Sequence, residues 1–297
     1  MKHIQIKNII KKRYAGIKLL FEQVILHFNE EDIHLFRVEV KKLRAFMRLV
    51  STVPDEEFEF KLPKKLNEFY HTLGVIRSLQ IQKQHVLKVL EENHSVNPEI
   101  YLNLLTTMIA NDIKLVTDLA EKKTPFDKGE EKVLRTVHEK LKKTVIREFT
   151  ASKVKFLKEL LKPLFLSDES LHSIRKILTD FVYTWSYINE EVNLIMPHGM
   201  FSTEEEIISV TQLLGDFEDI CVCLHLLHAE HMDKAINENE DTLLPDIEKE
   251  WLKQKEIARD KIHKVFQTNI SFNHKYPSMA NGNQSQLADK VLSTAVY

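Results

Sequence analysis

Glycine and proline are scarce in this sequence, with 6 Gly and 8 Pro among 297 residues. A β-sheet protein of this length needs many tight turns, and tight turns need residues that tolerate a positive φ or that restrict φ. Long helices joined by a few short connections need far fewer such residues. The scarcity therefore predicts an all-α fold.

Cysteine and long apolar runs are also in short supply. The two cysteines, Cys221 and Cys223, would point about 200° apart on a helix, which is a poor geometry for a disulfide. No stretch approaches the roughly 18 apolar residues of a membrane span. Lysines interrupt the first twenty residues, so the apolar core of a signal peptide is missing. We therefore expect a cytoplasmic protein that does not span a membrane.

Signatures of catalysis are absent from the sequence. It has no nucleophile elbow, no P-loop and no dinucleotide-binding fingerprint, and six glycines leave no loop that could cradle a phosphate. No carboxylate cluster suited to Mg²⁺ is evident. We expect a protein without enzymatic activity and without a cofactor.

One set of residues has the chemistry of metal ligands. Glu218, Cys221, His225 and His228 recur on one face of a predicted helix. The same face carries apolar residues upstream, so it is more simply read as core. A single helix also cannot surround one ion with four ligands. We therefore predict no metal site.

Apolar residues recur with a helical period along most of the chain. The breaks fall at proline or at short polar side chains, as helix ends usually do. From residue 269 onward the period is lost and polar residues dominate, so we expect a disordered tail over 269–297. The predicted helices are 2–28, 31–53, 64–92, 98–123, 128–149, 151–166, 169–195, 203–237 and 242–268.

Two pairs of landmarks indicate an internal repeat. A His-x-x-Arg sequence occurs at His34 and again 138 residues later at His172. A Leu-Gly pair ends 40 residues after the first histidine, at Gly74, and 43 residues after the second, at Gly215. The spacing predicts two helical bundles related by an approximate two-fold axis, repeat 1 over about 1–149 and repeat 2 over about 150–268. Chance pairing of such short landmarks is the alternative.

Positive charge is concentrated on one face of a helix, although the net charge is only −2. Surface helices usually mix opposite charges, so a line of cations on one face destabilises the protein unless an anion lies along it. A linear polyanion fits such a line, because arginine contacts phosphate oxygens bidentately. A solvated basic face, or one neutralised by the acidic segment 203–260, is the alternative. The line of basic residues comprises His34, Arg37, Lys41, Arg44 and Arg48, which fall within about 80° on a helical wheel.

These motifs resemble those of the CHAD family, the conserved-histidine α-helical domain. The resemblance lies in His34-x-x-Arg37-Val-x-x-Lys41-Lys42-x-Arg44-x-x-x-Arg48, Leu73-Gly74-x-x-Arg77, His172-x-x-Arg175-Lys176 and Gln212-x-Leu214-Gly215-Asp216-x-x-Asp219. It covers residues 1–268 and implies one domain of two pseudo-symmetric antiparallel four-helix bundles. It also implies non-enzymatic binding of inorganic polyphosphate and a location in the cytoplasm or at polyphosphate granules. The residues implied as contacts are His34, Arg37, Lys41, Lys42, Arg44, Arg48, Arg77, His172, Arg175 and Lys176.

The second repeat departs from the family pattern. The cations expected seven and ten positions after His172 are replaced by Thr179 and Val182, and Asp180 adds a negative charge. This departure leaves a second hypothesis open, in which the fold is a helical scaffold that binds protein partners through the segment 203–260. Nucleic-acid binding shares the electrostatics, but no aromatic residues alternate with the basic line as base-stacking platforms would.

Overall fold

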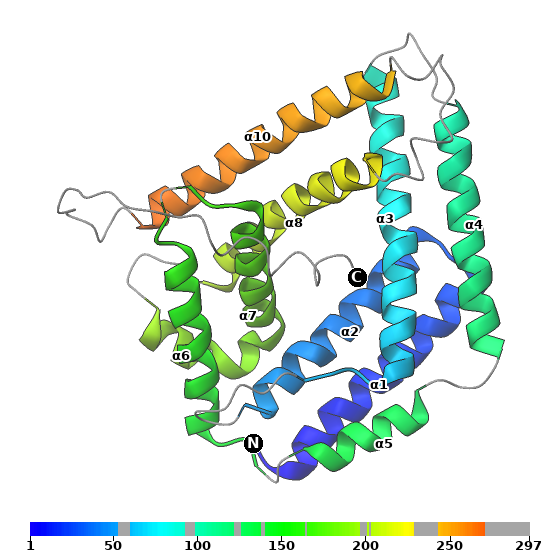
Figure 1. The fold of residues 1–297 in the computed structure, drawn as a ribbon. Coiled ribbons are helices and arrows are strands. Elements are labelled where there is room, and N and C mark those ends of the chain that lie inside the picture. The colour runs from blue at the N-terminus through cyan, green and yellow to red at the C-terminus, as the bar shows by residue number, and fades with distance from the viewer. Residues whose placement is uncertain are drawn as a thin grey trace, which may run out of the picture.

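The computed structural model describes residues 1–52, 60–92, 99–121, 126–137, 140–163, 165–196, 201, 203–228 and 243–270. These residues are helical apart from short connections and one isolated bridge between Lys2 and Lys140 (Figure 1). The all-α prediction is confirmed, and the predicted tail lies outside the described residues except where the last helix reaches Ile270. The helices are α1 (His3–His27), α2 (Glu30–Val50), α3 (Lys64–Glu92), α4 (Glu99–Glu121), α5 (Asp127–Thr136), α6 (Lys143–Leu160), α7 (Asp168–Ile195), α8 (Glu204–Leu227) and α10 (Leu243–Ile270).

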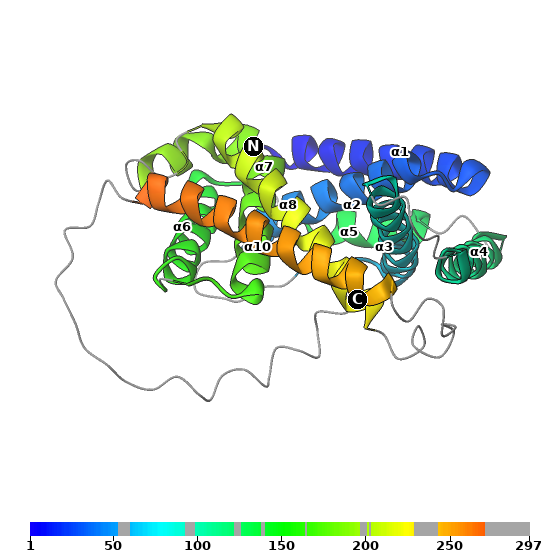
Figure 2. The same cartoon turned by 90° about the horizontal axis from the view of Figure 1, so that it is seen from above.

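The helices pack in an order that occurs twice. In the first half, α1 contacts α2, α2 contacts α3 and α3 contacts α4. In the second half, α6, α7, α8 and α10 contact one another in the same order. The halves meet where α2 packs against α7 and α3 packs against α8, so the two central helices of each half contact their own counterparts (Figures 1 and 2). This arrangement confirms two pseudo-symmetric helical units; α5 is an additional helix against α1.

The starts of α2 and α7 position the two motif histidines equivalently. Asn29 Oδ1 accepts a hydrogen bond from Asp32 N at 2.8 Å, and Ser167 Oγ accepts one from Ser170 N at 3.2 Å. Both caps are followed by acidic residues in the first turn, which interact favourably with the helix dipole. Each histidine then lies five residues after its cap, in the second turn of its helix.

The chain break between the halves lies earlier than the sequence indicates. Helices were expected over 128–149 and 151–166, but α5 ends at Thr136 and α6 runs through residue 150 without interruption. The connection is instead held by backbone pairing with the N-terminus: Met1 N donates to Leu141 O at 2.9 Å, and Leu141 N donates to Met1 O at 3.1 Å. Pairing between positions 140 residues apart leaves no local mark, and no proline or glycine signals the break.

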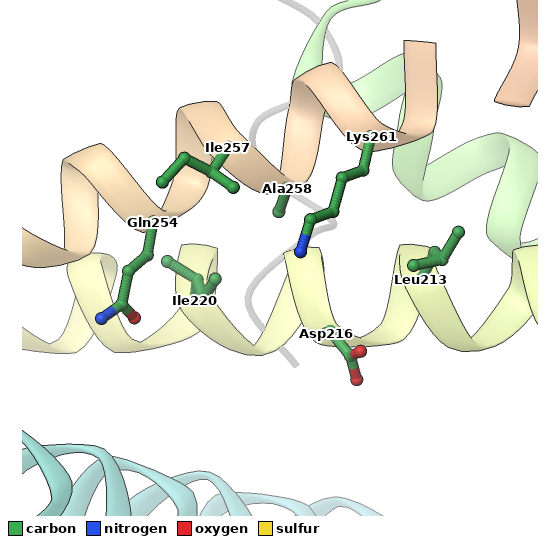
Figure 3. Close-up of a pocket in the computed structure, with 7 residues that line it drawn as sticks. All are labelled: Leu213, Asp216, Ile220, Gln254, Ile257, Ala258 and Lys261. Atoms are coloured by element: carbon green, nitrogen blue, oxygen red, sulfur yellow. The ribbon is translucent and has the colours of Figure 1, made fainter. Parts of the chain in front are cut away.

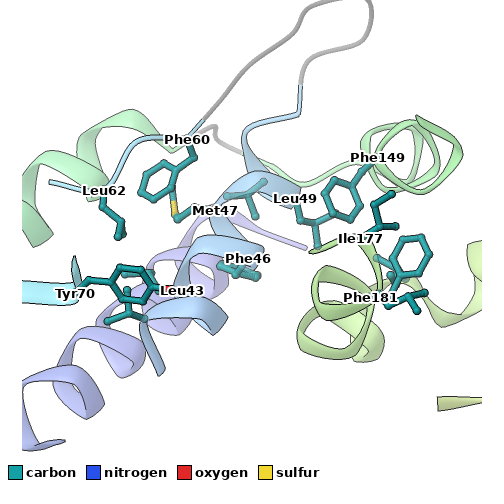
Figure 4. Close-up of a cluster of buried hydrophobic side chains, with 14 of the residues drawn as sticks. Leu43, Phe46, Met47, Leu49, Phe60, Leu62, Tyr70, Phe149, Ile177 and Phe181 are labelled. Atoms are coloured by element: carbon teal, nitrogen blue, oxygen red, sulfur yellow. The ribbon is translucent and has the colours of Figure 1, made fainter. Parts of the chain in front are cut away.

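The hydrophobic core is built around α2, which is covered on more than one side. Figure 4 shows Met47 and Leu49 between Phe60 on one side and Phe149 and Ile177 on the other. The ring of Phe46 lies 5.4 Å from that of Tyr187 in α7, measured between centroids. A second cluster joins α3, α4, α8 and α10 around the fully buried Trp251. None of the described helices combines the length and apolar character that a membrane span requires.

Candidate functional site

Cationic side chains of α2 gather around Tyr70 of α3. Arg37 Nη1 donates a hydrogen bond to the Tyr70 carbonyl oxygen at 2.6 Å, and the Arg37 Cζ atom lies 4.5 Å from the centre of the Tyr70 ring. The Arg44 Cζ atom lies 5.6 Å from the same ring centre. Lys41 lies one turn from Arg37 and faces the same tyrosine. We call Arg37, Lys41, Arg44 and Tyr70 the Tyr70 cluster.

Ionisation in the Tyr70 cluster reflects crowding of positive charge. Burial lowers the pKa of Arg37 and of Lys41. Neighbouring cations lower both further, while Tyr70 and Glu218 act in the opposite direction. Burial alone would raise the pKa of the Tyr70 phenol. The positive charges of Arg37, Lys41 and Arg44 outweigh burial and lower that pKa below its ordinary value. The lowered pKa of the Tyr70 phenol therefore indicates a positive electrostatic potential at this place.

The cations of the Tyr70 cluster have no anionic partner within the described chain. None of the described carboxylates forms an ion pair with Arg37, Lys41 or Arg44. Most other arginines in the described part of the chain do form an ion pair with a carboxylate. The Arg44 Nε atom is buried and has no hydrogen-bond partner there. Partly desolvated like charges in one place are unfavourable unless an anion compensates them. The arrangement is therefore suited to binding an anion.

Three further residues predicted from the first motif lie beside the cluster. His34 lies at the surface but is partly covered by its neighbours. This partial burial and the charge of Arg77 lower its pKa, while Glu31 opposes the shift. Arg77 Nη1 lies 3.0 Å from Glu30 Oε2, and Lys42 Nζ lies 3.8 Å from Glu39 Oε2. Arg77 and Lys42 thus already have carboxylate partners, whereas the residues of the Tyr70 cluster do not.

Arg48 points into the protein at the contact between the two halves. Its guanidinium forms a bidentate ion pair with Asp180 of α7, in which Nε lies 3.0 Å from Oδ2 and Nη2 contacts Oδ1. Lys153 of α6 contacts the same carboxylate at 3.0 Å, and the Asp180 side chain is 3% exposed. The structure therefore places Arg48 in a structural ion-pair network, apart from the Tyr70 cluster.

The residues predicted from the second repeat meet a carboxylate of α8. His172 Nδ1 lies 2.8 Å from Glu218 Oε1, and Arg175 Nη1 donates to Glu218 Oε2. Burial would raise the pKa of Glu218, but the hydrogen bond from His172 and the charge of Arg175 lower it to about 2. The carboxylate is therefore ionised at neutral pH. Lys176, which directly follows Arg175 in α7, is exposed.

The two glycines of the Leu-Gly landmarks, Gly74 and Gly215, each make room for an arginine. A Cβ atom on Gly74 would overlap Arg37 Nη1, and one on Gly215 would lie 3.1 Å from Arg175 Nη2. The Leu-Gly landmarks of the sequence thus have the same physical cause in each half. The two halves also share one electrostatic site, because the charge of Arg175 contributes to the lowered pKa of Lys41.

Sequence reasoning missed Tyr70 and Glu218 as site residues. The sequence offers Glu218 as a possible metal ligand, but in the structure its carboxylate accepts from His172 and Arg175. The position of Glu218 in the sequence could have assigned it to the site, because it lies three residues after Gly215, as Arg77 lies three residues after Gly74. Tyr70 lies one helical turn before Gly74, and this position on the same helix face could have identified it as a site residue.

A small pocket lies on the other side of α8, against α10 (Figure 3). Its charged residues are Asp216 and Lys261, and the remainder of its lining is largely aliphatic. Among the described residues no group of three or more His, Cys, Asp or Glu side chains is arranged to hold a metal ion. The Tyr70 cluster with the adjoining His172–Arg175–Glu218 group is therefore the candidate site.

Comparisons with known proteins agree on the fold. The family model described as CHAD domain matches residues 9–228. The crystal structure of the CHAD domain from the plant Ricinus communis is 15% identical, covers 90% of this chain and 92% of its own, and superposes with a TM-score of 0.66. PptA from Streptomyces chartreusis is 13% identical, with coverages of 90% and 99% and a TM-score of 0.62. Among curated protein sequences none matches this chain.

Proposed function

Because the chain belongs to the CHAD family, we propose that it binds inorganic polyphosphate through the Tyr70 cluster and catalyses no reaction on it. The observation that carries the proposal is the group of three cations, Arg37, Lys41 and Arg44, without carboxylate partners among the described residues. From His34 to Arg44 this line extends about 15 Å along α2. A chain of phosphates presents its charge along a line of that kind, whereas a single phosphate can meet only part of it.

Binding of this kind is electrostatic and releases counterions. Affinity should therefore fall steeply as the salt concentration rises. The function is tested by titrating the purified full chain with long-chain polyphosphate at low and physiological salt, with orthophosphate as the control. Tight, salt-sensitive binding of the polymer alone supports the proposal, and an absence of binding even at low salt contradicts it. Competition with single-stranded RNA distinguishes polyphosphate from nucleic acid as the preferred polyanion.

A helical scaffold that recruits proteins is the second candidate function. Its support is that Asp180 and Glu218 neutralise cations in or near the second half of the site. A protein partner retained at high salt, and retained equally by variants of the Tyr70 cluster, would favour this candidate. Under either function we place the protein in the cytoplasm, and under the first also at polyphosphate granules.

His34 makes polyphosphate binding dependent on pH. In the free protein its lowered pKa leaves the imidazole neutral at pH 7. A phosphate chain beside it favours the charged form and raises that pKa, so binding takes up a proton. Affinity should increase about 3- to 10-fold between pH 8 and pH 6, and His34→Gln should remove most of this increase.

The measurement is the Kd at both pH values and constant ionic strength, with long chains that carry few titrating terminal phosphates. His71, whose pKa is lowered by burial and by Arg44 and Arg37, also faces the cluster, so His71→Gln is measured in parallel. Full pH dependence in the His34→Gln variant would refute the role of His34.

Gly74→Ala should weaken binding without weakening the fold. The new methyl group would occupy the place of Arg37 Nη1, which lies at the end of a flexible side chain and can move away. Alanine is also favoured over glycine within a helix by about 1 kcal/mol. We expect an unchanged or higher melting temperature and an affinity for polyphosphate reduced about 10-fold, the loss of one charge-assisted contact.

Gly16→Ala in α1 is the matched control for this variant. Its added Cβ would lie 3.5 Å from Glu39 Cγ, an ordinary contact, and it brings the same gain in helix propensity. Its affinity should equal that of the wild type. If Gly74→Ala also binds with wild-type affinity, Arg37 does not contact the ligand from its observed position.

A further inference from the structure

A carboxylate already occupies the second half of the candidate site. Glu218 accepts from His172 Nδ1 at 2.8 Å and also accepts from Arg175 Nη1. Its side chain is 26% exposed, so solvent and ligands can reach the group. A carboxylate held by an imidazole and a guanidinium takes the position that a phosphate group would otherwise take.

The first half carries no such carboxylate at the matching place. Three residues after Gly74 stands Arg77, whereas three residues after Gly215 stands Glu218. Arg77 bonds to Glu30, while Arg37 bonds to a backbone carbonyl and forms no ion pair with a described carboxylate. The two halves therefore share a backbone arrangement and a glycine–arginine contact. They differ in charge at this position, in addition to the cations that Thr179 and Val182 replace in the second half.

Building on the proposed function, we propose that Glu218 is a specificity-determining residue, an internal counter-ion that closes the His172–Arg175 half to phosphate. Polyphosphate then engages the Tyr70 cluster of the first half alone. To bind His172 and Arg175, a phosphate would have to displace Glu218 and leave that carboxylate without partners beside an anion. The other charged groups facing Glu218 are Asp219, on its own helix, and Arg37 and Lys41 across the site.

Replacing Glu218 by an uncharged side chain should open the closed half. In the full chain, Glu218→Gln is expected to bind long-chain polyphosphate about 10-fold more tightly at low salt, with a steeper salt dependence because more cations meet phosphates. Glu205→Gln, at an exposed position on the same helix, changes the net charge equally and should leave the affinity unchanged.

The double variant Arg175→Gln with Glu218→Gln removes both partners and keeps the net charge. It should lose most of the affinity gained by Glu218→Gln and bind close to the wild-type affinity. The permanent charge of the opened half is then gone, and only His172 remains there. This variant also keeps the inference testable if Glu218→Gln alone does not fold, which circular dichroism will show.

Each outcome decides between the two proposals. In one outcome the wild type binds, Glu218→Gln brings no gain in affinity, and the double variant loses about 10-fold or more, the size of one charge-assisted contact. Arg175 is then a ligand contact, so the inference fails while the proposed function stands. If only Glu218→Gln binds, the inference stands and the proposed function of the wild type fails. If neither binds at low salt, both fail.

Discussion

Replacement of Arg37, Lys41 and Arg44 together by alanine is expected to reduce the affinity for long-chain polyphosphate about 100-fold or more at physiological salt, since each charge-assisted contact to phosphate contributes about 1.5–3 kcal/mol. Among the described residues these three are the lysine and arginine side chains of α2 that form no ion pair with a carboxylate. The salt dependence should also become shallower, with the slope reduced by about 2.

The fold should survive this change, because removing like charges that repel one another relieves a cost in the free protein. The far-ultraviolet spectrum and the melting temperature should therefore match or exceed those of the wild type. The matched control replaces the exposed Lys132, Lys155 and Lys158, which removes the same charge from α5 and α6. Equal loss of affinity in the control would mean that binding depends on total charge and not on the Tyr70 cluster.

Asp180→Ala is expected to have the largest effect on stability. It leaves Arg48 and Lys153 without their shared carboxylate at the contact between the two halves. Breaking a buried ion pair by removing one partner costs about 3 kcal/mol. For a chain of this size we expect the melting temperature to fall by about 5 °C, whereas affinity for polyphosphate, measured below that temperature, should change little.

Asp118→Ala is the control, since Asp118 is exposed on α4 and its removal should alter the unfolding free energy by less than about 0.5 kcal/mol. The double variant Arg48→Met with Asp180→Leu should recover part of the lost stability, because apolar side chains of similar volume replace a buried pair well. Lys153 loses its carboxylate partner in this variant too, so recovery is incomplete. A stability equal to that of the wild type after Asp180→Ala would show that the network is dispensable.

The sequence predicts the helical class, the repeat and the Tyr70 cluster's basic residues because these are local properties. A helical period, a cap and a line of cations on one face are all set by residues within a few turns of one another. The partner of Arg48 is not local: Asp180 lies 132 residues away and meets it only when α2 packs against α7. Arg48 shares the spacing of the basic line, so periodicity assigns it to the same face as Arg44 although its guanidinium turns toward α7.

The charge state of the second half was likewise beyond local reasoning. Thr179 and Val182 indicate a weaker cationic face, but they do not reveal that Glu218 reaches His172 and Arg175 from another helix. The extended connection around Leu141 has the same origin, since its partner is the opposite end of the first half. In each case the contact depends on packing between elements far apart in the chain.

The contact of α2 with α7 and of α3 with α8 is the geometry of an isologous dimer, in which one patch meets a copy of itself. In a homodimer of one repeat, every substitution would occur at both symmetry-related positions. A glutamate three residues after the glycine would then neutralise both arginines, and the whole anion site would close. Covalent joining of the two copies removes that constraint, so one half can carry Arg77 and the other Glu218 at the matching position. Duplication followed by fusion therefore lets one half keep its cations free of carboxylate partners while the other half changes independently.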